Sequence, residues 1–216
     1  MKDRLSGARQ RMVEEQIRRR GIDNRRVLAA IEAVPRQVFV PIASRHAAYG
    51  DGPLAIGHGQ TISQPYIVAL MTCALELQGS ERVLEVGTGS GYQAAILSHL
   101  AAEIHTVELI PELAARAKRV LRCLGCNNVS VHLGDGSVGW PAAAPYSAII
   151  VTAAAPALPL PLVEQLADPG RLVLPVVSDW DYQLLTLVRR EAGRTSEKVL
   201  ASVAFVPLRG KLGVKT

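Results

Sequence analysis

One short stretch constrains the fold more than any other, because it joins an apolar strand to three closely spaced glycines. Val83 to Val86 is a mostly apolar run of the kind that forms a buried strand of a parallel sheet. Glycines follow at positions 87, 89 and 91, and an apolar helical segment, 94–100, comes next. Glycine lets the backbone approach a ligand closely and adopt positive φ. The free N–H groups of the helix point at the same place, so the stretch predicts a nucleotide-type site at the carboxyl end of a strand.

The spacing of these glycines separates two classes of ligand. A dinucleotide-binding turn has the pattern G-x-G-x-x-G and sets a helix N-terminus against a pyrophosphate. Here the pattern is G-x-G-x-G, and the acidic Glu85 precedes it. A carboxylate at the strand end suits a cationic or amino-bearing ligand better than a pyrophosphate. The turn therefore favours S-adenosylmethionine over NAD; the alternative is a tight strand–helix turn that binds nothing.

Composition restricts the class of protein. The chain has 216 residues, and 49% of them are hydrophobic but only 4% aromatic. Aliphatic side chains and alanine must then fill the core, as in an α/β protein with a parallel sheet. The length suits one domain with an appendage. No apolar run approaches the ~20 residues of a membrane span, and no signal-peptide pattern opens the chain. We therefore expect a cytoplasmic protein without a membrane partner.

Two features suggest other functions only weakly. Cys123 and Cys126 have a C-x-x-C spacing, but no second Cys or His pair at ligand spacing accompanies them. We therefore expect neither a metal site nor a redox function. The net charge of +5 could attract nucleic acid. However, the densest basic run, Arg18 to Arg20, flanks a helical pattern and has no interleaved aromatic residues, so we expect no nucleic-acid partner.

Residues 1–78 are predicted to form a helical cap that carries an active-site loop and packs on the rest of the chain. One helix is expected over 5–20, and a second, capped by Asp23, ends before Pro35. Residues 49–60 are rich in Gly and Pro and predict a loop without regular structure. A loop of this length within a compact domain is usually functional.

A further helix, 67–77, begins just after Ser63, which lies where an N-cap residue would. On the local sequence alone, capping is the favoured interpretation of Ser63. Its hydroxyl can also donate to an anion held at the positive end of the helix. A carboxylate or phosphate site is therefore the second interpretation.

Residues 79–216 alternate between strand and helix patterns, which predicts right-handed crossovers and a parallel sheet. The last two strands, 183–189 and 199–208, resemble an antiparallel hairpin at the sheet edge. The predicted fold is α/β: a doubly wound, mostly parallel, seven-stranded Rossmann-like sheet with an N-terminal helical appendage. The other strands are predicted at 83–86, 103–109, 129–133, 148–152 and 171–177.

Two acidic residues follow strands of this predicted sheet. Glu108 lies 17 positions beyond Gly91 (108 − 91), about where a ribose-binding acid belongs. Asp135 lies between Gly134 and Gly136, and it can reach an adenine amino group or occupy a plain turn.

These residues together resemble the protein-L-isoaspartate O-methyltransferase family, from Arg11 to Leu208. The most specific element is Gly59-Gln60-Thr61-Ile62-Ser63-Gln64-Pro65. Other elements match the family in order: Val34-Pro35-Arg36, Phe39-Val40-Pro41, Ala48 to Asp51, Glu85 to Tyr92, and Gly134 to Gly136. His58 stands where the family usually has tyrosine, and Ser147 stands where it usually has aspartate, which leaves substrate preference and local packing open.

The resemblance implies a protein-repair enzyme that moves a methyl group from S-adenosylmethionine to the free α-carboxylate of L-isoaspartyl residues in damaged proteins and peptides, leaving S-adenosylhomocysteine. It implies Ser63 as the catalytic hydroxyl, no metal, and, we expect, a monomer. The cofactor residues implied are Glu85, Gly87, Thr88, Gly89, Ser90, Gly91, Glu108, Leu109, Asp135 and Gly136. The substrate residues implied are Thr61, Ile62, Ser63, Val206, Pro207 and Leu208.

This chemistry needs no general base, because a carboxylate is already ionised at neutral pH. No His–carboxylate or Cys–His pair stands out in the sequence. The rival interpretations are a methyltransferase acting on a small molecule or nucleic acid, a non-catalytic module that binds S-adenosylmethionine, and an NAD-dependent oxidoreductase.

Overall fold

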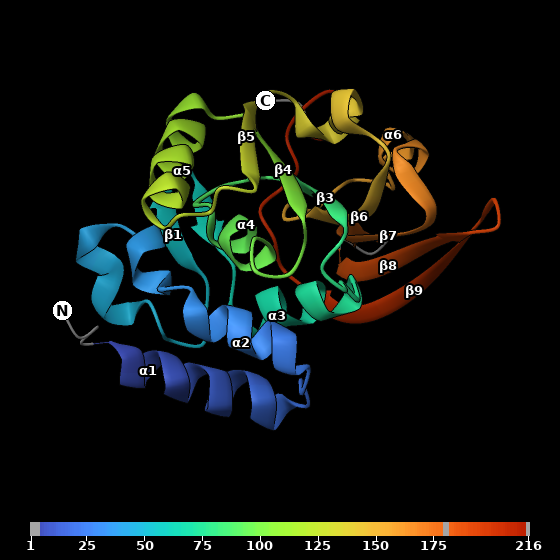
Figure 1. Cartoon of the computed structure of the whole chain (residues 1–216). Helices are drawn as coiled ribbons and strands as arrows, with labels where there is room; N and C mark the ends of the chain where they lie inside the picture. The colour runs from blue at the N-terminus through green and yellow to red at the C-terminus, as the bar shows by residue number, and fades with distance from the viewer. Residues whose placement is uncertain (1–4, 179–181, 215–216) are drawn as a thin grey trace.

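A seven-stranded sheet forms the centre of the protein in the computed structural model, which describes residues 5–178 and 182–214. Its strand order is β5-β4-β3-β6-β7-β8-β9. The first five strands in this order are parallel, and β8 and β9 are antiparallel. The predicted sheet with an antiparallel hairpin at its edge is confirmed (Figure 1). The strands are β3 Arg82–Val86, β4 Glu103–Glu108, β5 Val129–Leu133, β6 Tyr146–Val151, β7 Leu166–Val177, β8 Gln183–Glu191 and β9 Arg194–Val203.

Helices cover both faces of this sheet, which makes it doubly wound. Buried residues of α4 Tyr92–Leu97 and α5 Pro111–Cys123 belong to one hydrophobic core, together with Ile104 of β4. The α6 helix, Leu160–Glu164, packs with Leu84 of β3 in the core of the other face. Alternate residues of a strand point to opposite faces, so each strand contributes to both cores. Among the described residues, no helix combines the length and apolar character needed to cross a bilayer.

The N-terminal segment is helical as predicted, but its regular geometry is interrupted. The α1 helix, Ser6–Arg11, continues into a π-helical stretch, Met12–Ile17, and a 3-10 turn, Arg18–Arg20. The predicted cap of the next helix, α2 Arg25–Ala33, is wrong by one residue. Asn24, and not Asp23, accepts hydrogen bonds from the Arg26 and Val27 amides, because Asn24 has the extended backbone of an N-cap. Two 3-10 helices follow, at Arg36–Phe39 and Ile42–Ala47.

The segment predicted as an irregular loop contains a β-hairpin, so this prediction is wrong. The strands β1 Leu54–Gly57 and β2 Gln60–Ile62 pair antiparallel. Gly57, His58 and Gly59 all have positive φ, at 97°, 55° and 69°. Glycine adopts these angles without strain, so Gly57 and Gly59 form a tight turn around His58 in place of an irregular loop.

The N-terminal residues share their core with one face of the sheet. Buried side chains of α2 and of α3, Pro65–Ala74, belong to the same hydrophobic cluster as α4 and α5. Just beyond α3, the Glu76 carboxylate accepts hydrogen bonds from Arg171 of β7, at 2.7 Å, and from Arg189 of β8. The appendage is therefore packed on the α/β body, as predicted, while the division into domains at residue 78 stays a prediction.

The chain after β9 returns to the centre of the sheet. The predicted last strand, 199–208, is wrong at its end, because β9 stops at Val203. The following residues pair instead with the segment after β6. The Ala154 amide donates to the Val206 carbonyl, and the Leu208 amide donates to the Ala154 carbonyl, both at 2.8 Å. This crossing brings Val206–Leu208 to the carboxyl ends of the parallel strands.

Candidate active site

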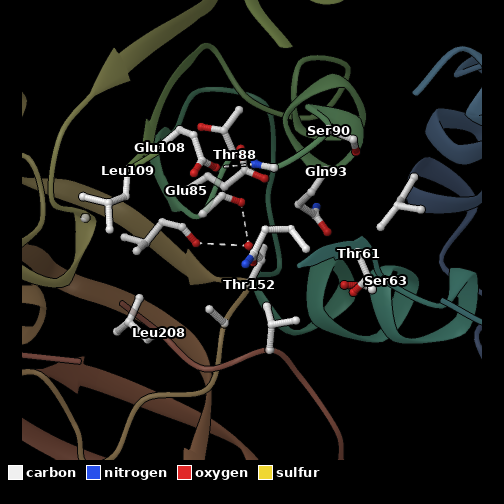
Figure 2. Close-up of a pocket in the computed structure, with 18 of the residues that line it drawn as sticks. Thr61, Ser63, Glu85, Thr88, Ser90, Gln93, Glu108, Leu109, Thr152 and Leu208 are labelled. Carbon is white, nitrogen blue, oxygen red and sulfur yellow. Dashed lines mark hydrogen bonds between the residues drawn. The ribbon is translucent and has the colours of Figure 1, made fainter. Parts of the chain in front are cut away.

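A pocket of about 890 Å³ lies at the carboxyl ends of β3, β4 and β6 (Figure 2). Its wall contains most of the residues that the sequence singled out, although they come from segments far apart in the chain. The glycine turn, the β1–β2 hairpin and the returning C-terminal segment all contribute. The predicted residues in the wall are Thr61, Ile62, Ser63, Glu85, Gly87, Thr88, Gly89, Ser90, Glu108, Leu109, Gly136, Val206, Pro207 and Leu208.

The glycine turn runs close to β6, which explains the need for glycine at its first position. Gly87 has φ of 91°, and a Cβ atom added there would lie 2.5 Å from Oγ1 of Thr152. Thr152 itself lines the pocket, and its hydroxyl donates to the Gly87 carbonyl at 2.6 Å. The sequence did not identify Thr152 as part of the site. A hydroxyl residue directly after an apolar strand is a weak signal that could have suggested it.

Gly91 and Asp135 are the two predicted cofactor residues that do not line the pocket. Gly91 has φ of 90°, and a Cβ atom there would meet Cβ of Ala117 at 3.3 Å, so this glycine lets α4 and α5 pack closely. The Asp135 carboxylate accepts hydrogen bonds from the Ser137 amide at 2.9 Å and the Lys211 amide at 2.7 Å. It therefore ties the C-terminal segment beside the pocket, while its neighbour Gly136 forms part of the wall.

Glu85 is a fully buried carboxyl group in the pocket wall. Its exposed fraction is 0%, and Oε2 accepts a hydrogen bond from the Thr106 hydroxyl at 2.5 Å. Oε1 is also buried and has no donor in good hydrogen-bond geometry among the described residues, although the Ala94 amide of α4 favours the carboxylate. Burial raises the pKa of Glu85 to about 8, against the opposing effect of the Thr106 hydrogen bond. The site therefore contains an acid that a bound cation would ionise.

Glu108 fixes the shape of the glycine turn. Its Oε2 accepts a hydrogen bond from the Gly89 amide at 2.7 Å, and its Oε1 accepts one from the Ile110 amide at 2.9 Å. A carboxylate has about four lone-pair sites, so two sites remain for a ligand's hydroxyl groups. Glu108 is only 6% exposed, and it lies beside Glu85 and Thr88 in Figure 2.

Ser63 lies just before α3, but it does not cap that helix. The N-cap position belongs to Gln64, no side chain caps the helix, and Pro65 occupies its first turn. The prediction of Ser63 as an N-cap is therefore wrong, because Pro65 moves the helix start one residue further on. The Ser63 carbonyl accepts a hydrogen bond from Nη2 of Arg36 at 2.7 Å, whereas its hydroxyl has no hydrogen-bond partner among the described residues.

A second cavity, of about 910 Å³, adjoins the first. Thr61 and Ser63 line both cavities. In the view of Figure 2 these two side chains lie together, across the pocket from Leu109 and Leu208. Ser63 therefore lies where the two cavities adjoin. The remaining walls of the second cavity are Pro53, Gln64, Ile67, Ser202, Val203, Ala204 and Phe205.

One His–carboxylate pair exists that the sequence did not predict. Nε2 of His105 lies 2.9 Å from Oε1 of Glu103. Glu103 begins β4, whereas Glu108 ends it at the pocket, and neither member of the pair lines either cavity. The pair therefore supplies no general base to the site.

The sequence also missed two polar side chains of the wall. Gln93 of α4 donates from Nε2 to the Thr72 hydroxyl at 2.9 Å, and only 7% of Gln93 is exposed. Arg209 is the single basic residue among those that line the first pocket. Both positions follow recognised motifs, but neither residue type is by itself a signal for ligand binding.

Comparison with known proteins identifies the family of this chain. A profile described as protein-L-isoaspartate (D-aspartate) O-methyltransferase (PCMT) matches residues 7–213. The chain belongs to this family. The protein-L-isoaspartate O-methyltransferase of Methanoculleus marisnigri is 53% identical over 205 residues, which cover 95% of this chain and 93% of the relative. The Geobacter metallireducens protein of the same name is 53% identical over 206 residues, covering 95% of each.

Solved structures of the family have the same fold. A protein-L-isoaspartate O-methyltransferase structure superposes with a TM-score of 0.85 at 28% identity, covering 95% of this chain and 67% of that one. A Plasmodium falciparum structure solved with S-adenosyl-L-homocysteine has a TM-score of 0.81 at 24% identity, covering 93% and 97%. The family fold, with its mostly parallel sheet and N-terminal appendage, thus extends over nearly the whole chain.

Proposed function

We propose that this protein transfers the methyl group of S-adenosylmethionine to the free α-carboxylate of L-isoaspartyl residues in damaged proteins and peptides. The observation that carries this proposal is the wall shared by the two cavities. Thr61 and Ser63 line both the pocket at the glycine turn and the second cavity, which we call the acceptor groove. Such a wall suits an enzyme that aligns a donor and an acceptor.

The residues of the pocket at the glycine turn fit the cofactor. Gly87 lets the turn lie close to Thr152, which also lines the pocket, and Glu108 has lone pairs free for two ribose hydroxyls. The buried Oε1 of Glu85 suits the positive charge of the sulfonium or the amino group. Thr88, Gly89, Ser90, Leu109 and Gly136 complete the proposed cofactor site. Asp135 would act by holding the C-terminal segment, and its direct contact with adenine stays a prediction.

The acceptor is proposed to bind in the groove, with its carboxylate at Ser63. When bound, the cofactor supplies a methyl group on a sulfonium, which is already a good leaving group. The Ser63 hydroxyl would orient the carboxylate beside Thr61, which also lines the groove. Ile62 and Val206–Leu208 line only the cofactor pocket, so their contact with the peptide stays a prediction. A neutral hydroxyl holds the nucleophile without strongly stabilising its charge. Alignment of this kind can be worth up to about 7–11 kcal/mol.

Several parts of the biological setting belong to this proposal. The partners would be proteins and peptides that contain isoaspartyl residues. The methyl ester would cyclise to a succinimide, which opens partly to normal aspartate and so repairs the chain. We expect the enzyme to act in the cytoplasm as a monomer and without nucleic acid.

The test is incubation with methyl-labelled S-adenosylmethionine and matched peptides that contain L-isoaspartate or L-aspartate at one position. We expect base-labile label on the isoaspartyl peptide alone, because a methyl ester hydrolyses readily in base. Equal labelling of both peptides, or base-stable label, would contradict the proposed acceptor. Binding of S-adenosylmethionine without any transfer would instead favour a non-catalytic module.

Cofactor affinity is expected to rise with pH, because of Glu85. The pKa of this carboxyl group is raised to about 8 by burial, so below that pH the free protein holds it mostly protonated. A bound cation favours the carboxylate, and binding must then release a proton. Affinity should increase by up to about tenfold per pH unit between about pH 6 and about pH 7.5, below the titration of the ligand's own α-amino group.

Isothermal titration calorimetry in buffers of different ionisation enthalpy measures both the affinity and the proton release. In Glu85→Gln the affinity should be lower and nearly independent of pH over the same range. If the wild-type affinity is equally flat, Glu85 does not face the cationic part of the ligand.

A further inference from the structure

Arg36 is a fully buried cation to which the proposed function assigns no role. Its exposed fraction is 0%, and it begins the 3-10 helix Arg36–Phe39. Burial of an arginine is costly unless its charge is compensated. No carboxylate in residues 5–178 or 182–214 forms an ion pair with it. Arginine keeps its proton in such surroundings, so a positive charge remains inside the protein.

The guanidinium group is held by backbone carbonyls instead. Nε donates to the Ala48 carbonyl at 2.8 Å, and Nη2 donates to the Ser63 carbonyl at 2.7 Å. Nη1 is buried and has no acceptor in good hydrogen-bond geometry among the described residues, although the Tyr92 hydroxyl lies beside the guanidinium. The charge therefore lies directly behind the residue that separates the two cavities.

Arg36 also contacts the wall of the cofactor pocket. Its Cζ atom lies 4.9 Å from the ring centroid of Tyr92, within cation–π range. Tyr92 begins α4, immediately after the glycine turn, and lines the cofactor pocket. One side chain thus connects the main chain of the acceptor site to the element that follows the cofactor turn.

We propose that Arg36 is a positioning residue that fixes the place of Ser63 relative to the cofactor pocket. Its charge, which no carboxylate among the described residues neutralises, makes the acceptor groove selective for an anionic acceptor. This inference rests on the proposed function. A charge in a low-dielectric interior acts strongly at short range and is little screened by salt. Because Arg36 acts from behind Ser63, it attracts a carboxylate without bonding to the oxygen that must attack.

A purely structural clamp is the competing explanation, and the chain offers a matched control. Arg26 also donates to two backbone carbonyls, to Leu77 at 2.5 Å and to Leu100 at 3.3 Å. Arg26 is an exposed residue, although its two hydrogen bonds are partly buried, and it lines neither cavity. Replacing Arg26 should lower the melting temperature without changing acceptor selectivity or turnover.

The experiment compares two acceptor ligands in the presence of S-adenosylhomocysteine. One is a fluorescent peptide with an L-isoaspartyl residue, and the other is its neutral α-carboxamide; anisotropy gives both dissociation constants. The wild-type protein should prefer the carboxylate by at least about tenfold, and Arg36→Gln should reduce this preference to within about threefold. Arg26→Gln should keep the wild-type preference. Arg36→Lys, which keeps a charge but not the planar fork, should lose about tenfold in kcat and less in KM.

The proposal would be overturned if folded Arg36→Gln kept the wild-type preference for the carboxylate. It would also be overturned if Arg36→Gln and Arg26→Gln both lost this preference in proportion to their loss of melting temperature. If Arg36→Gln fails to fold, the salt dependence of the carboxylate preference is measured in the wild-type protein. The preference should persist at about 0.5 M salt, because a buried charge is little screened, and its disappearance would overturn the proposal. If the wild-type protein does not methylate the isoaspartyl peptide at all, the proposed function fails, whatever Arg36 does.

Discussion

Replacing Ser63 with alanine should lower kcat by about 100-fold or more, while the dissociation constant of S-adenosylmethionine changes by less than about twofold. The Ser63 hydroxyl faces both cavities and has no hydrogen-bond partner among the described residues. It is therefore available to orient a bound carboxylate, and its loss affects the transfer step more than the binding of either ligand. Single-turnover assays with both ligands saturating measure this step directly.

The stability of the same variant separates a catalytic role from a structural one. If Ser63 capped α3, alanine would cost about 1 kcal/mol of unfolding free energy. The observed helix start at Pro65, with Gln64 at the N-cap, predicts a smaller change. Ser98→Ala is a suitable control, since the Ser98 hydroxyl donates to the Ala95 carbonyl at 2.7 Å and lines neither cavity. An equal loss of cofactor affinity in Ser63→Ala would show that Ser63 belongs to the cofactor site.

Local patterns were enough to predict the sheet and the glycine turn. The run from Val83 to Gly91 combines apolar residues with glycines at positions where the structure has positive φ. Strand and helix patterns alternate from there onward, and such alternation predicts parallel strands, although it does not predict their order in the sheet. The spacing of Glu108 from Gly91, at the end of a strand, predicts a place near the ligand, and Glu108 does line the pocket, while its contact with ribose stays a prediction.

Long-range contacts were not predictable in this way. Val206–Leu208 reach the pocket through hydrogen bonds with Ala154, and no periodicity in either segment encodes that pairing. Thr152 contacts the glycine turn only because β6 lies beside β3. Similarly, the loop prediction for 49–60 failed because glycines that end one element can also turn a hairpin. Arg36 was recognised only as part of a family motif, because its importance depends on which carbonyls surround it.

Replacing Glu108 with alanine should weaken cofactor binding by about tenfold to 100-fold, because hydrogen bonds to a charged group contribute about 1.5–3 kcal/mol each. The variant loses the proposed contacts to the ribose hydroxyls. It also leaves the Gly89 and Ile110 amides without their acceptors, which loosens the turn that approaches the ligand. The KM for S-adenosylmethionine should therefore rise far more than the KM for the isoaspartyl peptide. Calorimetric titration gives the affinity without turnover.

Two further substitutions separate the loss of the ribose contacts from a loosening of the glycine turn or of β4. Glu108→Gln keeps one carbonyl oxygen as an acceptor, so its affinity should lie between those of the wild type and Glu108→Ala. Glu103→Ala removes a carboxylate from the other end of β4, where it pairs with Arg82 at 2.7 Å, and should leave cofactor affinity unchanged. Because both glutamates lie on one strand, a general disturbance of β4 would weaken binding in both variants. Normal cofactor binding by Glu108→Ala would show that this carboxylate shapes the turn in the free protein and does not hold the ribose.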